Sequence, residues 1–80
     1  MEYWVDIQAP EGCERYVRSD ILRLEFSDKI LPGFFDRMVY GEEFFWFMPT
    51  SHVFRFAFKD ANKAMLFKLS WNGDLRKLTG

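Results

Sequence analysis

The stretch from Glu43 to Met48 reads Glu-Phe-Phe-Trp-Phe-Met, and it constrains the fold more than any other part of the chain. Aromatic side chains favour strands, because their bulk packs well on a pleated surface. Successive side chains of a strand point to opposite faces, so Trp46 would face one way, and Phe45 and Phe47 the other. Both faces are therefore apolar and need cover. We expect helices to cover one face, which leaves the other as a binding surface or a second core.

The aromatic content of the whole chain points the same way. The 80 residues include ten Phe, three Trp and three Tyr. Each buried aromatic side chain removes about 150–250 Å² of surface from water, so this number exceeds what one small core is expected to enclose. Aromatic residues are enriched at interfaces. We therefore expect some of them to lie at an interface.

Charge and cysteine content indicate a soluble, cytoplasmic protein. The net charge is −1 and the sequence pI is about 5.7, which gives no overall field to attract nucleic acid or acidic lipid. The single cysteine fits a reducing compartment. We expect no signal peptide and no membrane span, because residues 1–7 lack a basic region followed by a long apolar run, and no run of about 20 apolar residues occurs. We expect one domain over residues 1–80, with residues 74–80 as a loose tail.

The first forty residues suggest a strand, a helix and a second strand. Residues 3–8 alternate between apolar and polar, apart from Trp4, which predicts a half-buried strand. A helical spacing of apolar residues follows and predicts a helix from Cys13 to about Glu25, although residues 22–26 also alternate like a strand. Leu31-Pro32-Gly33 indicates a turn, after which residues 34–40 are interpreted as a strand.

The second half suggests two more strands and a helix. Gly41-Glu42 is interpreted as a tight connection to the strand at residues 43–48, and residues 53–58 alternate cleanly. Asp60 can cap a helix over residues 61–70, whose residue types favour helix. A competing interpretation exists, because residues 65–71 also alternate and Asn72-Gly73 is a hairpin signal. We favour the helix.

The predicted order is strand, helix, three strands, helix. This order is typical of an α+β two-layer sandwich, ferredoxin-like in style, in which two helices cover one face of a four-stranded antiparallel sheet. The strand at residues 43–48 would be central. If Phe54, Phe56 and Phe58 pack under the helices, the opposite face holds Trp4, Asp6, Arg55, Ala57 and one of the two aromatic sets of residues 43–48. Trp71 and residues 75–78 could instead fold over this face.

A ten-residue stretch resembles part of a known family. Residues 51–60, Ser-His-Val-Phe-Arg-Phe-Ala-Phe-Lys-Asp, followed by Ala61 and Ala64, look like the third strand and second helix of an RNA recognition motif. The resemblance implies that Phe54 and Phe56 stack on bases. Arg55 stands where that family has a small residue, and His52-Val53 replaces its basic-glycine opening. We interpret this as similarity of architecture and not of descent.

The sequence gives little support for catalysis or a cofactor. Cys13 could be a nucleophile, but it falls on the apolar face of the expected helix, where a free cysteine is commonly a small buried side chain. His52 is the only histidine and follows Ser51, yet adjacent side chains of an extended segment point apart. One Cys and one His cannot supply a structural zinc site, and the glycines are scattered. We expect no enzyme activity, no cofactor and no metal.

These observations predict a non-catalytic, protein-binding module that acts sterically on a larger macromolecule. Exposed aromatic side chains and an arginine are the composition of interface hot spots. The expected partner-binding residues are Trp4, Phe45, Trp46, Phe47 and Arg55. Such a short chain is typical of a small regulator or inhibitor, including those that phages encode against host or defence machinery. The same surface, or an exposed strand edge, could support partner binding or a homodimer. The alternative is a single-stranded nucleic-acid binder, which would need a basic rim.

Overall fold

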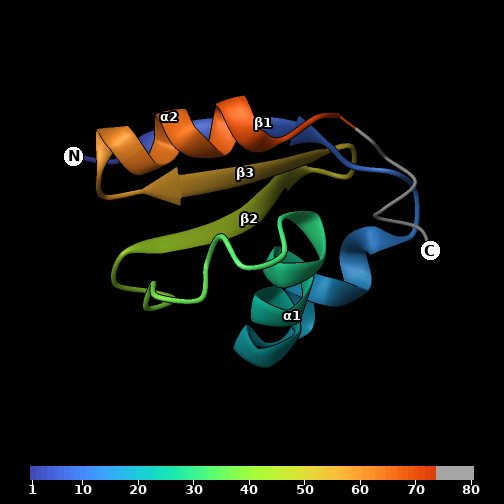
Figure 1. The fold of residues 1–80 in the computed structure, drawn as a ribbon. Coiled ribbons are helices and arrows are strands. Elements are labelled where there is room, and N and C mark those ends of the chain that lie inside the picture. Colours follow the sequence, from blue (N-terminus) through green and yellow to red (C-terminus); the bar gives the residue numbers. More distant parts are fainter. Residues whose placement is uncertain (74–80) are drawn as a thin grey trace.

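The computed structural model describes residues 1–73 and shows a small, compact α+β domain (Figure 1). Its elements, in chain order, are β1 (Tyr3–Gln8), the 3-10 helix η1 (Cys13–Arg18), α1 (Asp20–Ile30), β2 (Phe44–Thr50), β3 (Val53–Phe58) and α2 (Ala61–Ser70). The predictions for the strands at residues 3–8 and 53–58 and for the helix at residues 61–70 are confirmed. The loose tail predicted for residues 74–80 lies outside the described residues.

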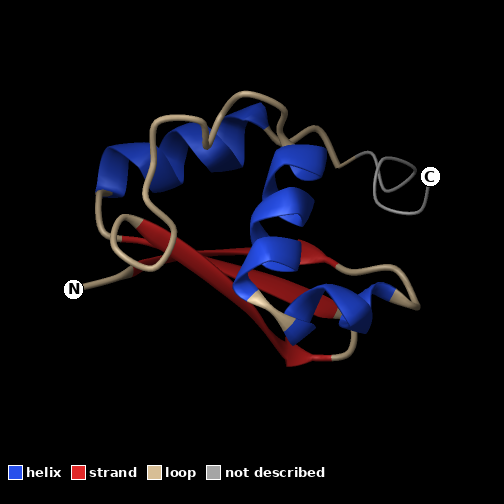
Figure 2. Ribbon diagram, turned by 90° about the horizontal axis from the view of Figure 1, so that it is seen from below, coloured by secondary structure: helices blue, strands red, loops and turns tan. Residues whose placement is uncertain are grey.

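The sheet has three antiparallel strands in the order β1-β3-β2. The central strand is β3, and not the strand at residues 43–48 as predicted. Trp4, Ala57 and Phe45 form one row across the sheet, and Asp6, Arg55 and Phe47 form the next. Both helices lie on one face of the sheet, and Figure 2 shows the other face without a helix.

The prediction of a fourth strand at residues 34–40 is wrong, and with it the four-stranded, ferredoxin-like sheet. Residues 31–43 form successive turns, and Tyr40 makes only an isolated bridge to Phe44. In a strand, Phe34 and Phe35 would point to opposite faces. Here both enter the same core, since Phe34 packs edge-on against Phe67 and Phe35 stacks on Phe44 at 4.4 Å. Burial of both rings therefore favours a turn over an extended chain.

The single helix predicted from Cys13 to Glu25 is also wrong. The chain is extended at Ser19, with φ −153° and ψ 160°, and this break separates η1 from α1. The Ser19 hydroxyl accepts a hydrogen bond from the Leu22 amide at 3.2 Å, which is the N-cap arrangement that serine favours. The break turns α1 about its axis, so Ile21 is 73 % exposed while Phe26 and Ile30 are fully buried.

Helix α2 forms as expected, and the alternative of a strand and hairpin over residues 65–73 is wrong. The Asp60 carboxylate caps α2 by accepting from the Asn62 amide at 2.7 Å. Ala64 and Phe67 are buried against the sheet. The centroid of the Phe67 ring lies 4.7 Å from that of Phe56, so α2 packs on the same face as the side chain of Phe56.

The core lies between this face and the helices. Eight aromatic side chains are buried there: Phe26, Phe35, Phe44, Trp46, Phe54, Phe56, Phe58 and Phe67. The covered face therefore takes Phe44 and Trp46 of β2, the even-numbered residues of β3, and Tyr3, Val5 and Ile7 of β1. By alternation, the side chains between these residues lie on the opposite face, up to the register shift that follows Phe47 in β2.

Candidate functional site

The face of the sheet without a helix is the candidate site. We call it the open face and define it by Trp4 and Asp6 of β1, Arg55 and Ala57 of β3, and Phe45 and Phe47 of β2. Ala57 is buried because larger neighbours stand on both sides of it, whereas Trp4 is 55 % exposed. Phe45 and Phe47 are half-buried. The open face is thus an aromatic surface with a small side chain at its centre.

Arg55 organises one end of the open face. Its guanidinium forms a two-pronged ion pair with Asp6, with Nε–Oδ1 at 2.9 Å and Nη2–Oδ2 at 3.0 Å. The central carbon of the Arg55 guanidinium, Cζ, lies 4.4 Å from the ring centroid of Trp4 and 6.0 Å from the ring centroid of Phe47. A planar guanidinium suits this combination of bidentate pairing and contact with aromatic rings.

The ion pair affects the titration of both partners. The hydrogen bonds from Arg55 hold the pKa of Asp6 below its usual value, and the same bonds raise the pKa of Arg55. The Asp6 side chain is 46 % exposed, so water screens the attraction and the net stabilisation is small. The main effect of the pair is to hold the guanidinium in place and to neutralise its charge.

The aromatic side chains of the open face contact one another. Trp4 and Phe47 pack edge to face with centroids 6.4 Å apart, across the gap that Arg55 fills. Phe45 and Phe47 stack at 6.1 Å along β2. Such contacts restrict the rotamers of the rings before any partner binds. A surface that is already ordered loses less entropy on binding.

Of the five predicted binding residues, four lie on the open face: Trp4, Phe45, Phe47 and Arg55. The fifth, Trp46, is fully buried. Its indole N–H donates to the backbone carbonyl of Arg23 in α1 at 2.9 Å, and the Arg23 guanidinium lies over its ring at 5.8 Å. The prediction that Trp46 lies on a binding surface is therefore wrong. Its side chain is in the core and anchors β2 to α1.

The resemblance to an RNA recognition motif fails at the residues that would stack on bases. Phe54 and Phe56 are fully buried under the helices. Phe54 packs on Phe26 of α1 with centroids at 4.7 Å, and Phe56 packs on Phe67 of α2. Their rings are thus unavailable to a base. A stacking surface on this sheet would have to use the opposite face.

The two candidate catalytic residues, Cys13 and His52, lie in different environments. Cys13 is buried at the start of η1, and burial raises the pKa of its thiol, which disfavours the reactive thiolate. His52 lies in the exposed turn between β2 and β3. Over residues 1–73, no group of three or more His, Cys, Asp or Glu side chains is placed to hold a metal ion. No helix in the same part of the chain is long and apolar enough to cross a bilayer.

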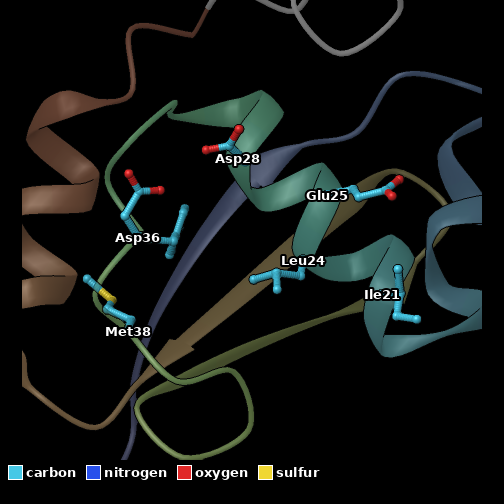
Figure 3. A pocket seen from close by; sticks show the side chains of 7 residues that line it. Ile21, Leu24, Glu25, Asp28, Asp36 and Met38 are labelled. Carbon is cyan, nitrogen blue, oxygen red and sulfur yellow. The ribbon is translucent and has the colours of Figure 1, made fainter.

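A cleft beside α1 is a feature that the sequence did not predict. It has a volume of about 500 Å³ and lies between α1 and the turns of residues 31–43. Figure 3 shows Leu24 and Met38 on opposite walls, and Asp28 and Asp36 together at one end. The Asp28 carboxylate accepts from the Gly33 amide at 3.2 Å, so it helps to fix the turn that follows α1. The sequence does not predict this cleft, because residues 34–40, which form part of one wall, have the pattern of a strand.

The alternative prediction was that Trp71 and residues 75–78 fold over the open face, and of these the structure describes only Trp71. Trp71 packs against the core cluster under the helices, and not on the open face. Residues 75–78 lie outside the described residues.

Comparison with known proteins adds no assignment. No protein-family model matches this chain, and no curated protein or solved structure matches it either.

Proposed function

We propose that this protein is a non-catalytic binding module that docks its open face onto a larger protein. The observation that carries the proposal is the arrangement of Trp4, Phe47 and Arg55: two aromatic rings that reach solvent, held by one arginine that is itself fixed by Asp6. Trp, Tyr and Arg dominate the hot spots of protein interfaces. A fixed arginine between exposed rings is such a cluster in the free protein.

The charge of the open face favours a protein over a nucleic acid as the partner. The positive charge of Arg55 is neutralised by Asp6, and Lys59 at the end of β3 lies 4.0 Å from the Glu2 carboxylate. A single-stranded nucleic-acid groove needs unpaired basic groups along the backbone path. Aromatic rings with neutralised charges are instead typical of the centre of a protein interface.

The mechanism that fits this surface is steric. The open face carries no nucleophile and no pair of acid and base, so binding itself would be the activity. A domain of 9.6 kDa that covers a functional surface of a larger protein would act as a small regulator or inhibitor. A standard interface buries about 800 Å² on each partner, so the open face would form the centre of the interface and its surroundings the rim.

The test is site-specific photo-cross-linking with a benzophenone amino acid at two positions. Position 47 lies on the open face, and position 66 is a matched apolar position on the exposed side of α2. In extracts of the source cells, we expect one specific protein adduct from position 47 and none from position 66. The adduct should be competed by added wild-type protein but not by a Trp4→Ala variant. The same adduct from both positions would contradict the proposal.

A fluorescent oligonucleotide distinguishes the alternative function. If the protein binds single-stranded DNA or RNA, affinity must fall steeply with salt concentration because counterions are released. We expect no binding even at low salt. Salt-dependent binding that is lost in a Phe47→Ala variant would replace the protein partner by a nucleic acid.

A further inference from the structure

The outer edge of β1 offers unpaired backbone groups. The Ala9 amide donates to the His52 carbonyl at 2.8 Å, which continues the register of β1 on β3 by one residue. Pairing alternates along an antiparallel ladder, so the odd-numbered residues of β1 bond to β3. The N–H and C=O groups of Trp4 and Asp6 therefore point away from the sheet. Within residues 1–73, these outward groups have no hydrogen-bond partner.

The opposite edge of the sheet is protected, which makes the contrast informative. On β2, the Phe44 carbonyl accepts from the Gly41 amide at 2.7 Å, and the Trp46 carbonyl accepts from the Tyr40 hydroxyl at 3.4 Å. Free edges are usually blocked by lysine, proline or a bulge, because they otherwise pair with another strand. The stretch Tyr3–Gln8 contains none of these. Its one charged residue, Asp6, is already paired with Arg55.

Helix α2 adds an exposed flank above the same edge, made by Ala61, Met65 and the cation Lys68. Lys63 of α2 forms an ion pair with Glu43, the residue before β2, with Nζ–Oε1 at 3.1 Å. The side of α2 that carries Lys63 therefore faces β2. Met65 is two residues further on, about 200° around the helix, and therefore lies on the flank that faces away from β2. Met65 is 58 % exposed. Ala61 and Lys68 share this flank, because residues three or four apart are neighbours on a helix.

We propose that a second copy of this chain occupies the β1 edge, with the two β1 strands antiparallel about a two-fold axis. The charges of β1 select the register. With Val5 opposite its own copy, Trp4 faces Asp6 and Tyr3 faces Ile7 across the axis. If the register shifts by two residues in one direction, Asp6 lies opposite Asp6 of the second copy. If it shifts by two residues in the other direction, Asp6 lies opposite Glu2 of the second copy. Like charges directly opposite each other are destabilising, so both shifts are disfavoured.

The position of α2 suits this dimer. Helix α2 packs on both β1 and β3, so its axis lies above the space between these two strands. Measured across the sheet, the axis is about half a strand spacing, about 2.4 Å, from β1 towards β3. Adding one strand spacing of about 4.8 Å between the two β1 strands separates the two α2 axes by about 9.6 Å. Packed helices lie about 8–10 Å apart. Met65 would therefore meet Met65 of the second copy while the β1 strands pair.

The dimer would join two three-stranded sheets into one sheet of six strands. A two-fold axis perpendicular to the sheet places both open faces on the same side. The two aromatic surfaces would then form one larger platform, suited to a partner with two adjacent copies of its binding site. This dimer does not depend on the proposed function, because the backbone edge of β1 and the flank of α2 can form it whether or not a partner docks on the open face.

Light scattering over a wide range of protein concentration tests the association. We expect the molar mass to rise from 9.6 kDa towards twice that value. Met65→Lys should weaken the dimer by about tenfold or more, since it brings like charges together at the axis. Leu66→Lys adds the same charge on the Lys63 side of α2 and should leave the dimer unchanged. A monomer at all concentrations would overturn the proposal.

Amide hydrogen exchange tests whether the β1 edge is the interface. In the dimer, the amides of Trp4 and Asp6 should become protected, and on dilution they should exchange quickly. The amides of Val5 and Ile7 should stay protected in both states, because they bond to β3. A dimer without protection at Trp4 and Asp6 would overturn the proposed interface. Protection that appears only when a different protein is added would overturn the second copy as the occupant.

Discussion

Trp46 and Phe47 are neighbours in β2, yet they belong to two different environments. Trp46 is fully buried and hydrogen-bonds to α1, whereas Phe47 stands half-buried on the open face beside Arg55. The two faces of β2 are similarly aromatic, so apolar content alone does not distinguish core from surface. The helices make the difference, because both pack on one face. Three of the aromatic residues outside the buried core, Trp4, Phe45 and Phe47, therefore lie on the open face, whereas Tyr16, Phe34, Tyr40 and Trp71 pack at the margin of the core.

The largest effect should come from comparing these two neighbours. Trp46→Ala removes a fully buried ring and should lower the free energy of unfolding by about 3–5 kcal/mol. Phe47→Ala removes a half-buried ring and should cost about 1 kcal/mol or less. Urea unfolding monitored by circular dichroism measures both. Equal losses would mean that the open face is a second core.

A smaller effect should separate the indole hydrogen bonds of the two faces. Trp46→Phe removes the indole donor to the Arg23 carbonyl, which still accepts from the Ser27 hydroxyl at 2.9 Å, so the loss should be that of one hydrogen bond, about 0.5–1.5 kcal/mol. Trp4→Phe is the matched control, because the Trp4 indole N–H donates to the Glu2 carboxylate in an exposed contact of 3.4 Å, and phenylalanine keeps an aromatic ring beside Arg55. We expect the control to change stability by less than about 0.5 kcal/mol. A loss in the control as large as that in Trp46→Phe would contradict this assignment.

The smallest effect should come from the ion pair on the open face. The pKa of Asp6 is lower in the folded chain than in the unfolded one, because Arg55 stabilises the charged carboxylate. The stabilisation is therefore present above the unfolded pKa of about 3.9 and is lost as the pH falls through the folded pKa. Asp6→Asn should cost less than about 1 kcal/mol at neutral pH, since the pair is exposed.

The pH dependence of that difference is the check. Unfolding free energies of wild type and Asp6→Asn should converge as the pH is lowered from about 7 to about 2. A difference that stays constant over this range would show that the carboxylate charge contributes nothing, and that Asp6 acts only through its shape.

Local patterns were sufficient where one interaction decides the structure. The alternation of Phe54, Phe56 and Phe58 predicted β3, and Asp60 before residues that favour helix predicted α2. The patterns were insufficient where tertiary packing decides. Phe34 and Phe35 have the composition of a strand, but both enter one core. Ser19 is a residue type that favours a helix N-cap, but the apolar spacing on both sides of it favoured one continuous helix, and so the helix start at Ser19 was not predicted.

The candidate site was predictable only in outline. Period-two alternation placed Trp4 and Arg55 on one face, and register shows that they are neighbours there. Alternation could not decide whether Trp46 or Phe47 joins them, because that choice depends on which face the helices cover. The α1 cleft could not be predicted, since it needs the turns of residues 31–43 to pack against α1.

The most direct test of the account is hydroxyl-radical footprinting of the intact chain of 80 residues, with mass spectrometry to quantify oxidation at each aromatic residue. The central claim is that the open face is exposed to solvent in the free protein. We predict strong labelling of Trp4, Phe45 and Phe47, and protection of Trp46 and Phe56. Protection of Phe45 and Phe47 at every protein concentration would contradict the claim, because it would mean that the chain covers this face itself.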